Sequence, residues 1–431
     1  MSQFLILKGD LCFSTDPHTL KTMENGYLLC EDGLCRGVYK ALPEEYKNLP
    51  VEDHSGCIII PGLVDLHVHA PQYAYRALGM DKELLEWLNT YAFPEEGKYN
   101  DLSYAGQAYG YFTEDLKRSA TTRACIFATL HREAAELLMK KLADTGLDCF
   151  VGKVNMDRNS PEYLCETTEE SLEETDRWLE ETDGLYPNVR PMLTPRFTPT
   201  CSDPLMEGLH LLQQKYQVPL QSHLSENLSE IAWVKELCPW SEFYGDAYDH
   251  FGLFGGACPT VMAHCVHSSP EEVQRIADRG VFIAHCPQSN MNVASGIAPV
   301  RRYLEKGLHV GLGSDVAGGS SLSIFRAMTD AVQVSKLYWR LVDQNAAPLT
   351  VPEAFYLGTM GGGAFWAAAG IGRKACGTFL PGYEADAVVL RDDHLPHPQP
   401  LTLQERLERI LYLSSDQQVT AKYVKGKKLA L

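Results

Sequence analysis

Short apolar runs alternate with longer helical patterns along most of this 431-residue chain. The first run spans 63–69. Helical patterns follow such runs at 166–181 and from Pro270, where a proline occupies the first turn of the expected helix. Seven further strands are predicted at 124–128, 149–154, 189–193, 219–223, 260–264, 281–285 and 309–313. Eight strands alternating with helices pair in parallel, and this predicts an α/β fold with a closed (β/α)₈ TIM-type barrel.

Both ends of the chain carry a β pattern without helices. Residues 26–30 and 34–39 flank Asp32-Gly33, which is a hairpin turn signal. Residues 377–390 alternate and turn, and residues 420–431 read as a further strand pair. We therefore predict two domains. Residues 1–60 and 377–431 would form a small β-sandwich domain, and residues 61–376 would form the barrel.

Charge and composition narrow the possible partners and location. The chain has 56 Asp and Glu against 38 Lys and Arg, a formal net charge of −18, which opposes binding to a phosphate backbone. No apolar run approaches the ~20 residues of a membrane span, and the start MSQFLILKGD lacks a signal peptide pattern. The 13 cysteines are scattered without a C-x-x-C pair, as expected of reduced thiols. We predict a soluble, cytoplasmic protein that binds neither nucleic acid nor membrane.

His67 and His69 stand two residues apart at the end of the first predicted strand. In an extended chain, residues i and i+2 point to the same side. Two imidazoles therefore project together, just before Pro71 ends the strand. This arrangement suits two ligands of one metal ion.

Other polar side chains also follow the predicted strands, where active sites of parallel barrels lie. Clustered histidine and carboxylate groups mark metal centres, so we predict one at this rim. Cys258, Cys265 and Cys286 stand near these histidines but within apolar runs, and we predict that they are core residues. The polar residues at the strand ends are His67, His69, Arg196, His223, Glu226, His264, His285 and Asp315.

The order of these residues resembles the amidohydrolase superfamily: His-x-His after the first strand, a histidine after each of the fifth and sixth, and an aspartate after the eighth. Within that superfamily, seven separated runs, which occur in order and extend over nearly the whole chain, resemble the guanine deaminase family. The runs are PGLVDLHVHAPQY, LLEWLNTYAFPEE, LTPRFTPTCS, QSHLSEN, VMAHCVH, IAHCPQSN and GLGSDVAGG.

The resemblance implies a zinc-dependent hydrolysis of guanine to xanthine and ammonia, a step of purine catabolism, in a homodimer. One zinc ion per subunit would be held by His67, His69, His223 and Asp315, although iron accepts the same ligands. A second metal would need a lysine after the fourth strand, where this chain has Thr-Pro-Arg-Phe. The residues implied to contact guanine are His69, Gln72, Arg196, Phe197, His223, Glu226 and Asp315.

The residue types agree with that chemistry. Glu226 follows His223 by three positions, where strand gives way to turn, so it can reach the attacking water without being a ligand. We expect Glu226 to carry a proton to the ring and to the departing amine. Asp315 can also accept a water proton, and His264 can hydrogen-bond the developing oxyanion. For His285, a direct role and the orientation of a neighbour both stay open.

Three other functions agree with parts of this sequence pattern. An amidohydrolase acting on a cytosine-, triazine- or hydantoin-type ring would not need the Arg196-Phe197 pair and Gln72. The unrelated zinc deaminases combine His-x-Glu with Pro-Cys-x-x-Cys. Here His131-Arg-Glu133 matches the first half, but no Pro-Cys-x-x-Cys follows. A barrel that has lost its activity would be expected to have a broken ligand set, whereas all four ligands are present.

Overall fold

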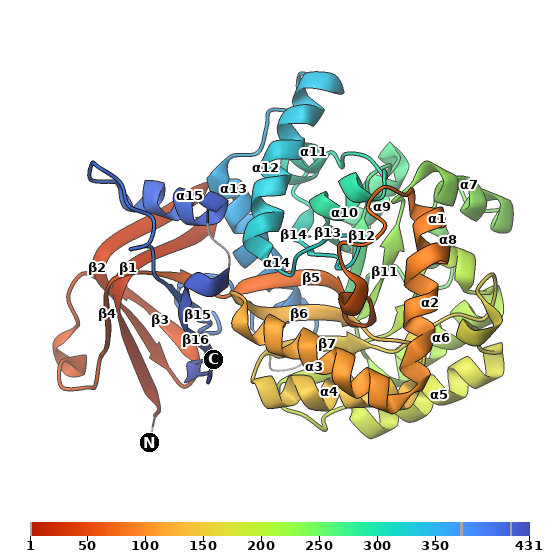
Figure 1. Cartoon of the computed structure of the whole chain (residues 1–431), viewed down its shortest axis with the longest axis horizontal. Helices are drawn as coiled ribbons and strands as arrows, with labels where there is room; N and C mark the ends of the chain where they lie inside the picture. The colour runs from red at the N-terminus through yellow and green to blue at the C-terminus, as the bar shows by residue number, and fades with distance from the viewer. Residues whose placement is uncertain (1, 371–373, 414–415) are drawn as a thin grey trace.

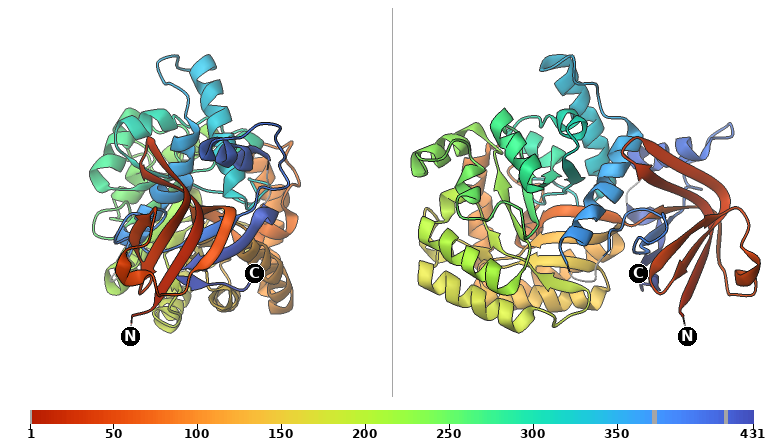
Figure 2. Two further views of the ribbon diagram at one scale, coloured as in Figure 1. Left: turned by 90° about the vertical axis from the view of Figure 1, so that its left-hand side faces the viewer. Right: turned by 180° about the vertical axis from the view of Figure 1, so that it is seen from behind.

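A computed structural model describes residues 2–370, 374–413 and 416–431 of the chain. It has two parts, a ring of strands surrounded by helices and a twisted sheet beside it (Figure 1). Figure 2 shows from two further sides that the sheet lies at one side of the ring, where β4 (Glu52–Pro61) leads into β5 (Leu63–His69). None of the helices that the structure describes combines the length and the apolar character that a membrane span needs.

Eight parallel strands form the ring at the places that the sequence predicts. The first sheet has the order β5, β6 (Thr121–Phe127), β7 (Asp148–Gly152) and β9 (Val189–Pro191). The second has the order β11 (Leu220–Leu224), β12 (Thr260–His264), β13 (Phe282–His285) and β14 (His309–Leu312). The predicted α/β fold with parallel strands is confirmed.

Backbone hydrogen bonds join the two sheets at both seams. Leu193 and Leu220 form a parallel bridge between the end of the first sheet and β11. At the other seam, the N–H of Asp315 donates to the carbonyl of His67 at 2.8 Å, and the N–H of His69 donates to the carbonyl of Val316 at 3.1 Å. The strands therefore close into a barrel, as the sequence predicts.

The fourth strand is shorter than predicted. β9 ends at Pro191. Leu193 then forms an isolated bridge with Leu220, and the next strand is β10 (Thr194–Pro195), which lies beside β8 (Val154–Asn155). Proline has no N–H to donate, so Pro191 and Pro195 prevent an unbroken ladder of hydrogen bonds. The residues after this break, Arg196 and Phe197, enter the mouth of the barrel.

The helices begin and end where the local sequence provides caps. α5 (Thr168–Thr182) begins with a capping box between Thr167 and Glu170, and α9 (Pro270–Arg279) ends at Gly280, whose φ of 64° lies in the left-handed region. The other α-helices outside the mouth are α3 (Leu102–Arg118), α4 (Arg132–Thr145), α6 (Asp203–Tyr216), α7 (Leu228–Leu237), α8 (Asp246–Asp249), α10 (Pro287–Asn292), α11 (Val300–Glu305), α12 (Ile324–Leu341), α13 (Val351–Tyr356), α14 (Gly362–Ala368) and α15 (Leu403–Leu413). Short turns are η1 (Glu44–Tyr46), η5 (Glu162–Leu164), η6 (Thr198–Thr200), η7 (Leu357–Gly361) and η8 (Asp416–Gln418).

Residues 70–100 run across the mouth of the barrel, and we call them the cover segment. The sequence did not predict its elements, because each is too short to show a clear period. The N–H of Leu84 donates to the carbonyl of Val293 at 3.1 Å and ties the segment to the chain after α10. Its elements are η2 (Ala70–Tyr75), α1 (Leu84–Trp87), the π-helical turn η3 (Leu88–Ala92), α2 (Phe93–Glu96) and η4 (Gly97–Asn100).

Both ends of the chain meet in the sheet beside the barrel. Its order is β17, β16, β15, β4, β1, β2, β3, so strands from the two ends are neighbours at β15 and β4. The predicted turn at Asp32-Gly33 joins β2 to β3, with φ of 50° and 78°. The assignment of this sheet to a separate domain, with boundaries at 60 and 377, stays a prediction. The strands not yet given are β1 (Phe4–Asp16), β2 (Thr19–Glu31), β3 (Leu34–Tyr39), β15 (Ala387–Leu390), β16 (Val419–Val424) and β17 (Lys427–Lys428).

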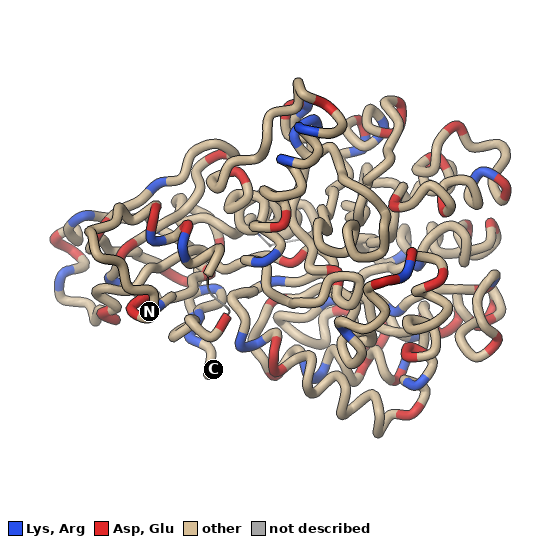
Figure 3. The backbone as a smooth tube through the Cα atoms, turned by 45° about the horizontal axis from the view of Figure 1, so that its top comes forward, with Lys and Arg blue, Asp and Glu red and all other residues tan. Residues whose placement is uncertain are grey.

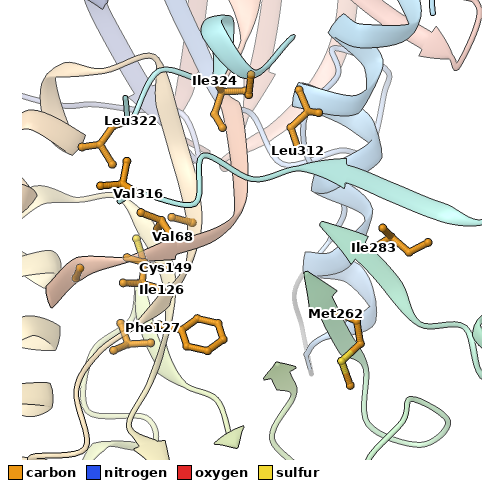
Figure 4. Packing of buried hydrophobic residues seen from close by; sticks show 14 of the residues in the cluster. Val68, Ile126, Phe127, Cys149, Met262, Ile283, Leu312, Val316, Leu322 and Ile324 are labelled. Carbon is orange, nitrogen blue, oxygen red and sulfur yellow. The ribbon is translucent and has the colours of Figure 1, made fainter. Parts of the chain in front are cut away.

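The two faces of this sheet belong to different hydrophobic clusters, because side chains alternate along a strand. On β4, Ile59 packs in a cluster confined to the sheet and residues near it, whereas Ile58 and Ile60 belong to the main core shared with the barrel. The main core continues across β5, β6 and β7 through Val68, Ile126 and Cys149 (Figure 4). The sheet is thus anchored to the barrel by one whole face.

Acidic side chains are distributed over both parts of the molecule (Figure 3). In places, several acidic side chains share one basic residue. Arg132, for example, lies within 3.0 Å of carboxylate oxygens of Glu136, Glu174 and Glu181. The acidic residues behind the formal net charge of −18 are therefore distributed along the chain and not concentrated in one segment.

A buried ion pair also joins the barrel to the sheet. Arg123 on β6 is fully buried, and it donates from Nε to Asp386 Oδ2 at 2.6 Å and from Nη2 to Asp386 Oδ1 at 3.1 Å. A carboxylate oxygen of Glu384 lies 2.7 Å from its Nη1. A bidentate pair of this kind fixes geometry, and loss of one partner leaves an uncompensated buried charge.

We expect the substitution Asp386→Ala to lower the free energy of unfolding by about 3 to 5 kcal/mol, the usual cost of breaking a buried ion pair. Urea unfolding followed by circular dichroism measures this change. Glu44→Ala, which removes the exposed pair between Glu44 and Lys47, is the control and should have little effect. Equal unfolding curves for Asp386→Ala and the unmodified protein would contradict the assignment.

Candidate metal centre and active site

Four side chains predicted as metal ligands converge at the carboxyl ends of β5, β11 and β14. His67 Nε2 lies 3.1 Å from Asp315 Oδ1, and His69 Nε2 lies 3.5 Å from the same oxygen. The Nε2 atoms of His69 and His223 are 3.3 Å apart. Ligand atoms placed about 2.0 to 2.2 Å from a tetrahedral zinc ion are separated by about 3.3 to 3.5 Å. The spacing therefore fits one metal ion.

The hydrogen bonds of these histidines are also compatible with metal binding. His223 Nδ1 lies 2.6 Å from the carbonyl oxygen of Arg196, to which it donates, and this leaves the Nε2 lone pair for a metal. Both ring nitrogens of His67, and Nδ1 of His69, are buried without a hydrogen-bond partner among the described residues. Buried polar atoms without partners are unfavourable, and a metal ion at Nε2 of His67 would satisfy one of them.

Electrostatics holds three of these groups, His69, His223 and Asp315, in the protonation states that a metal requires. Burial, together with the neighbouring His67, keeps the pKa values of His69 and His223 well below the usual value, so both imidazoles are neutral. Burial would raise the pKa of Asp315, but the facing histidines, His67 first, hold it well below its ordinary range. Neutral imidazoles beside an ionised carboxylate are the metal-binding forms.

The backbone at the strand ends is unusual, and it aims these side chains into the barrel. Ser225, His264 and Asp315 have φ values of 46°, 76° and 44°, in the left-handed region that non-glycine residues seldom adopt. Asp65 supports this arrangement, since its carboxylate accepts from the N–H of His67 at 3.1 Å and from the N–H of Ser314 at 3.0 Å. Such strain is typical of functional sites.

Glu226 and His264 lie beside the ligand set. His264 Nε2 is 3.4 Å from Glu226 Oε2 and 3.7 Å from Asp315 Oδ2. Ser295 donates its hydroxyl to Glu226 Oε1 at 3.0 Å. Burial, followed by the charge of Asp315, raises the pKa of Glu226 to about 8. A carboxyl group in this range can both take up and release a proton near neutral pH.

A cavity with an empty volume of about 440 Å³ opens onto these groups. One wall is apolar and comes from the cover segment and the chain after α10. The other side carries hydrogen-bonding groups, an arrangement that suits a flat heterocycle. The lining residues are His69, Gln72, Leu84, Trp87, Leu88, Arg196, Phe197, His223, Glu226, Glu230, His264, Ser289, Val293 and Asp315.

The residues expected to contact a substrate lie in this cavity. Gln72 accepts from the N–H of Ala317 at 3.1 Å. Arg196 forms a buried ion pair with Glu96 of the cover segment. The ring centroid of Phe197 lies 6.4 Å from that of His223. These three side chains therefore belong to the same site as the predicted ligands.

His285 and the three cysteines named in the sequence analysis are not among the residues that line the cavity. His285 has both its ring nitrogens buried without a hydrogen-bond partner among the described residues. Burial lowers its pKa to about 3. Cys286 packs among apolar residues in the lower part of the barrel, although its sulfur also lies near ligand atoms of His264 and Asp315. Cys258 and Cys265 are buried, as predicted of core residues.

Sequence reasoning missed several residues of the site. Glu96 and Asn290 each end one of the runs quoted for the resemblance, which was the only signal for them. Asn290 accepts from His264 Nδ1 at 2.9 Å, and Glu230 accepts from the N–H of Glu226 at 3.1 Å. The contact between His264 and Asn290 joins residues 26 positions apart and has no local signal, whereas Glu230 is the N3 residue of the capping box that opens α7 at Asn227, a pattern that a sequence can show.

The family model that describes the amidohydrolase family matches residues 58–429. This segment covers most of the chain and contains every residue of the site described above. The chain belongs to the amidohydrolase family. Members of this family are metal-dependent hydrolases, which agrees with the proximity of His67, His69 and Asp315 in the structure.

Relatives within the amidohydrolase family carry a common name. The chain is 40% identical to guanine deaminase from Dictyostelium discoideum over 386 residues, which cover 88% of this chain and 84% of that protein. It is 34% identical to guanine deaminase from Escherichia coli (strain K12) over 422 residues, 95% of this chain and 92% of that one. The predicted resemblance to this group is confirmed.

A solved amidohydrolase structure agrees with these sequence comparisons. It is a crystal structure of guanine deaminase from C. acetobutylicum with bound guanine in the active site. It is 44% identical to this chain, superposes with a TM-score of 0.95, and the match covers 99% of this chain and 100% of that one. The barrel with an additional β part is thus the fold of a known amidohydrolase.

We expect His67→Ala and His223→Ala each to strip the metal, because loss of one ligand of four leaves an incomplete shell. Elemental analysis of the purified variants measures this, with catalytic activity as a second readout. His131→Ala is the control, since His131 does not line the cavity, and it should retain the metal. Full metal content in both ligand variants would show that the ligand set is wrong.

Proposed function

We propose that this protein hydrolyses guanine to xanthine and ammonia, using one zinc ion per subunit held by His67, His69, His223 and Asp315. The observation that carries the proposal is the 44% identity, over nearly the whole chain, to a guanine deaminase solved with bound guanine. The cavity supports it independently, because it places hydrogen-bonding groups and an apolar wall beside the proposed ligands. The direct test is to incubate the protein with guanine and to measure the release of xanthine and ammonia.

Glu226 has the central part in the proposed proton transfers. A zinc ion in such a site makes water acidic enough to act as a nucleophile near neutral pH. The water oxygen adds to the ring carbon that bears the amino group, and Glu226 takes a proton and delivers it to the adjacent ring nitrogen. The second proton of the water goes to the departing amine, the carbon–nitrogen bond breaks, and ammonia leaves.

His264 and Asp315 would stabilise the charge that develops. His264 Nε2 lies within 3.7 Å of carboxylate oxygens of both Glu226 and Asp315, so it faces the position where the nucleophile must be held. We propose that it hydrogen-bonds the attacking oxygen. Asp315, besides serving as a ligand, can accept the second water proton. For His285, which does not line the cavity, we propose no direct role.

The remaining contacts would select the purine. Arg196 can donate to the two acceptors on the edge of guanine that carries O6 and N7, and Phe197 can pack on the ring face. Gln72 supplies an amide beside them. His69, His223, Glu226 and Asp315 would contact the ring at the reacting carbon. Turnover of a cytosine- or triazine-type ring in place of guanine would favour the alternative amidohydrolase activity.

Two further features are proposed on family grounds. We propose a homodimer, which size-exclusion chromatography with light scattering tests. We also propose a cytoplasmic location with a part in purine catabolism. The thirteen cysteines occur without a C-x-x-C pair, which supports a reducing compartment.

The substitution Glu226→Gln should retain the metal and the shape of the cavity while removing proton transfer. We expect the turnover number to fall by about 10²- to 10⁴-fold, the usual contribution of a general acid–base group. Steady-state kinetics with guanine and zinc analysis measure the two effects. Glu236→Gln, on the exposed side of α7, is the control. An unchanged turnover number for Glu226→Gln would remove Glu226 from the mechanism.

Guanine and adenine should be distinguished by Arg196. Adenine replaces the O6 acceptor with an amino donor, and a guanidinium offers only donors. We expect little turnover of adenine. For Arg196→Ala, we expect the KM for guanine to rise about 10- to 100-fold, since a hydrogen bond to a charged group contributes about 1.5 to 3 kcal/mol, with a lower turnover number and unchanged zinc content. Comparable rates on both purines would contradict this role.

A further inference from the structure

Glu96 of the cover segment connects two of the proposed substrate contacts. Its carboxylate is buried, with 1% of the residue exposed. Glu96 Oε1 accepts from Gln72 Nε2 at 2.8 Å, and Glu96 Oε2 pairs with Arg196 Nη1. Phe93, on the same helix α2, lies below the guanidinium, with its ring centroid 5.2 Å from Arg196 Cζ. One short helix therefore holds Arg196 by two contacts and Gln72 by a third.

The direction of these hydrogen bonds requires a carboxylate at position 96. The oxygen of Gln72 already accepts from the N–H of Ala317, so the amide meets Glu96 with its nitrogen, which can only donate. Arg196 also has only donors. Two donors thus face one side chain that has two acceptors and no donor. Glu96 thereby fixes which way the amide of Gln72 is turned.

Glu96 also supplies the negative charge that Arg196 needs in this site. Arg196 is 2% exposed, and a buried guanidinium without a counter-charge is strongly unfavourable. The ion pair uses Nη1, and the guanidinium has further donors that a ligand in the cavity can use. Glu96 itself does not line the cavity, so it acts on a substrate only through its partners.

We propose that Glu96 is a positioning residue for purine recognition, which orients Gln72 and Arg196 toward the base. This inference rests on the proposed function of the same site. It also gives a role to the run LLEWLNTYAFPEE, which the metal chemistry does not use.

The first test is the substitution Glu96→Gln in the zinc-loaded protein. An amide at this position turns a donor toward Gln72 or Arg196, so substrate contacts are weakened while the metal centre is unchanged. We expect the KM for guanine to rise about 10-fold or more, with a turnover number within about threefold of the unmodified protein and equal zinc content. Binding of xanthine, measured by calorimetry, should weaken in parallel.

Glu95→Gln is the matched control, because Glu95 is the adjacent buried glutamate of α2. Its carboxylate pairs with Lys98 at 2.6 Å and with Tyr104, and it has no contact with Gln72 or Arg196. We expect Glu95→Gln to change the thermal midpoint but to leave the KM within about twofold. An equal rise in KM for both variants, or no rise for Glu96→Gln, would overturn the proposal.

The second test exchanges the two side chains. Gln72→Glu alone places two carboxylates face to face, and we expect a lower thermal midpoint. In the double variant Gln72→Glu with Glu96→Gln, the new amide can donate to position 72 and accept from Arg196, so the pattern of donors and acceptors is restored. We expect the double variant to be more stable than Gln72→Glu. If the thermal midpoint of the double variant fell by the sum of the falls in the two single variants, the proposed contacts would be wrong.

These outcomes separate this proposal from the proposed function. If the unmodified protein released no xanthine from guanine, the proposed function would fail, while the exchange would still report on the contacts of Glu96. If guanine is hydrolysed and only the midpoints respond to Glu96→Gln, Glu96 is a structural residue and the positioning role is wrong.

Discussion

The seam between β5 and β14 is the constraint on which both the fold and the site depend. The N–H of Asp315 donates to the carbonyl of His67, and the N–H of His69 donates to the carbonyl of Val316. These bonds close the barrel between its first and last strands. They also bring two proposed ligands that are 248 positions apart in sequence, His67 and Asp315, within 3.1 Å of each other. Asp65 reinforces the seam by accepting from Ser314 and from the N–H of His67. Barrel closure and ligand geometry are therefore set by the same few hydrogen bonds, and a metal ion bound there would in turn stabilise the closed barrel.

The groups that face them shift the pKa values of two neighbouring buried carboxyl groups in opposite directions. Asp315 faces histidines, which hold its pKa far below the ordinary value, so it is ionised and available to a cation. Glu226 faces Asp315 and the hydroxyl of Ser295, and its pKa is raised to about 8 by burial and by the charge of Asp315. A pair of acids whose pKa values are moved apart can divide the work, one binding charge and the other moving protons. The different pKa shifts of Asp315 and Glu226 therefore follow from the groups that face their carboxylate oxygens in the folded structure, and not from their positions in the sequence.

The sequence predicts the barrel well because its signals are local. Apolar runs such as 124–128 and 260–264 mark buried strands, and the ends of those runs carry the polar residues of the site. Pro191 and Pro195 are the local signal for the break in the fourth strand, although the apolar run at 189–193 predicts a continuous strand. The left-handed backbone at His264 and Asp315 has no local signal, since neither residue is a glycine. The contact between Glu96 and Arg196 joins positions 100 residues apart, and only the folded cover segment brings them together.

Recognition and chemistry are attached to the fold in different ways. His67, His69 and His223 lie in strands, where backbone ladders hold the chain, and Glu226 and Asp315 follow the ends of β11 and β14. The apolar wall of the cavity, by contrast, belongs to the cover segment, which is held by single contacts such as the one from Leu84 to Val293. Substitutions in the cover segment can therefore reshape the cavity without moving the ligands, whereas a change at a strand end disturbs the barrel itself. Glu96 links the cover segment to the strand ends, because it belongs to the cover segment and pairs with Arg196, which follows a strand. A change of substrate in this scaffold would thus have to begin at the residues that Glu96 holds.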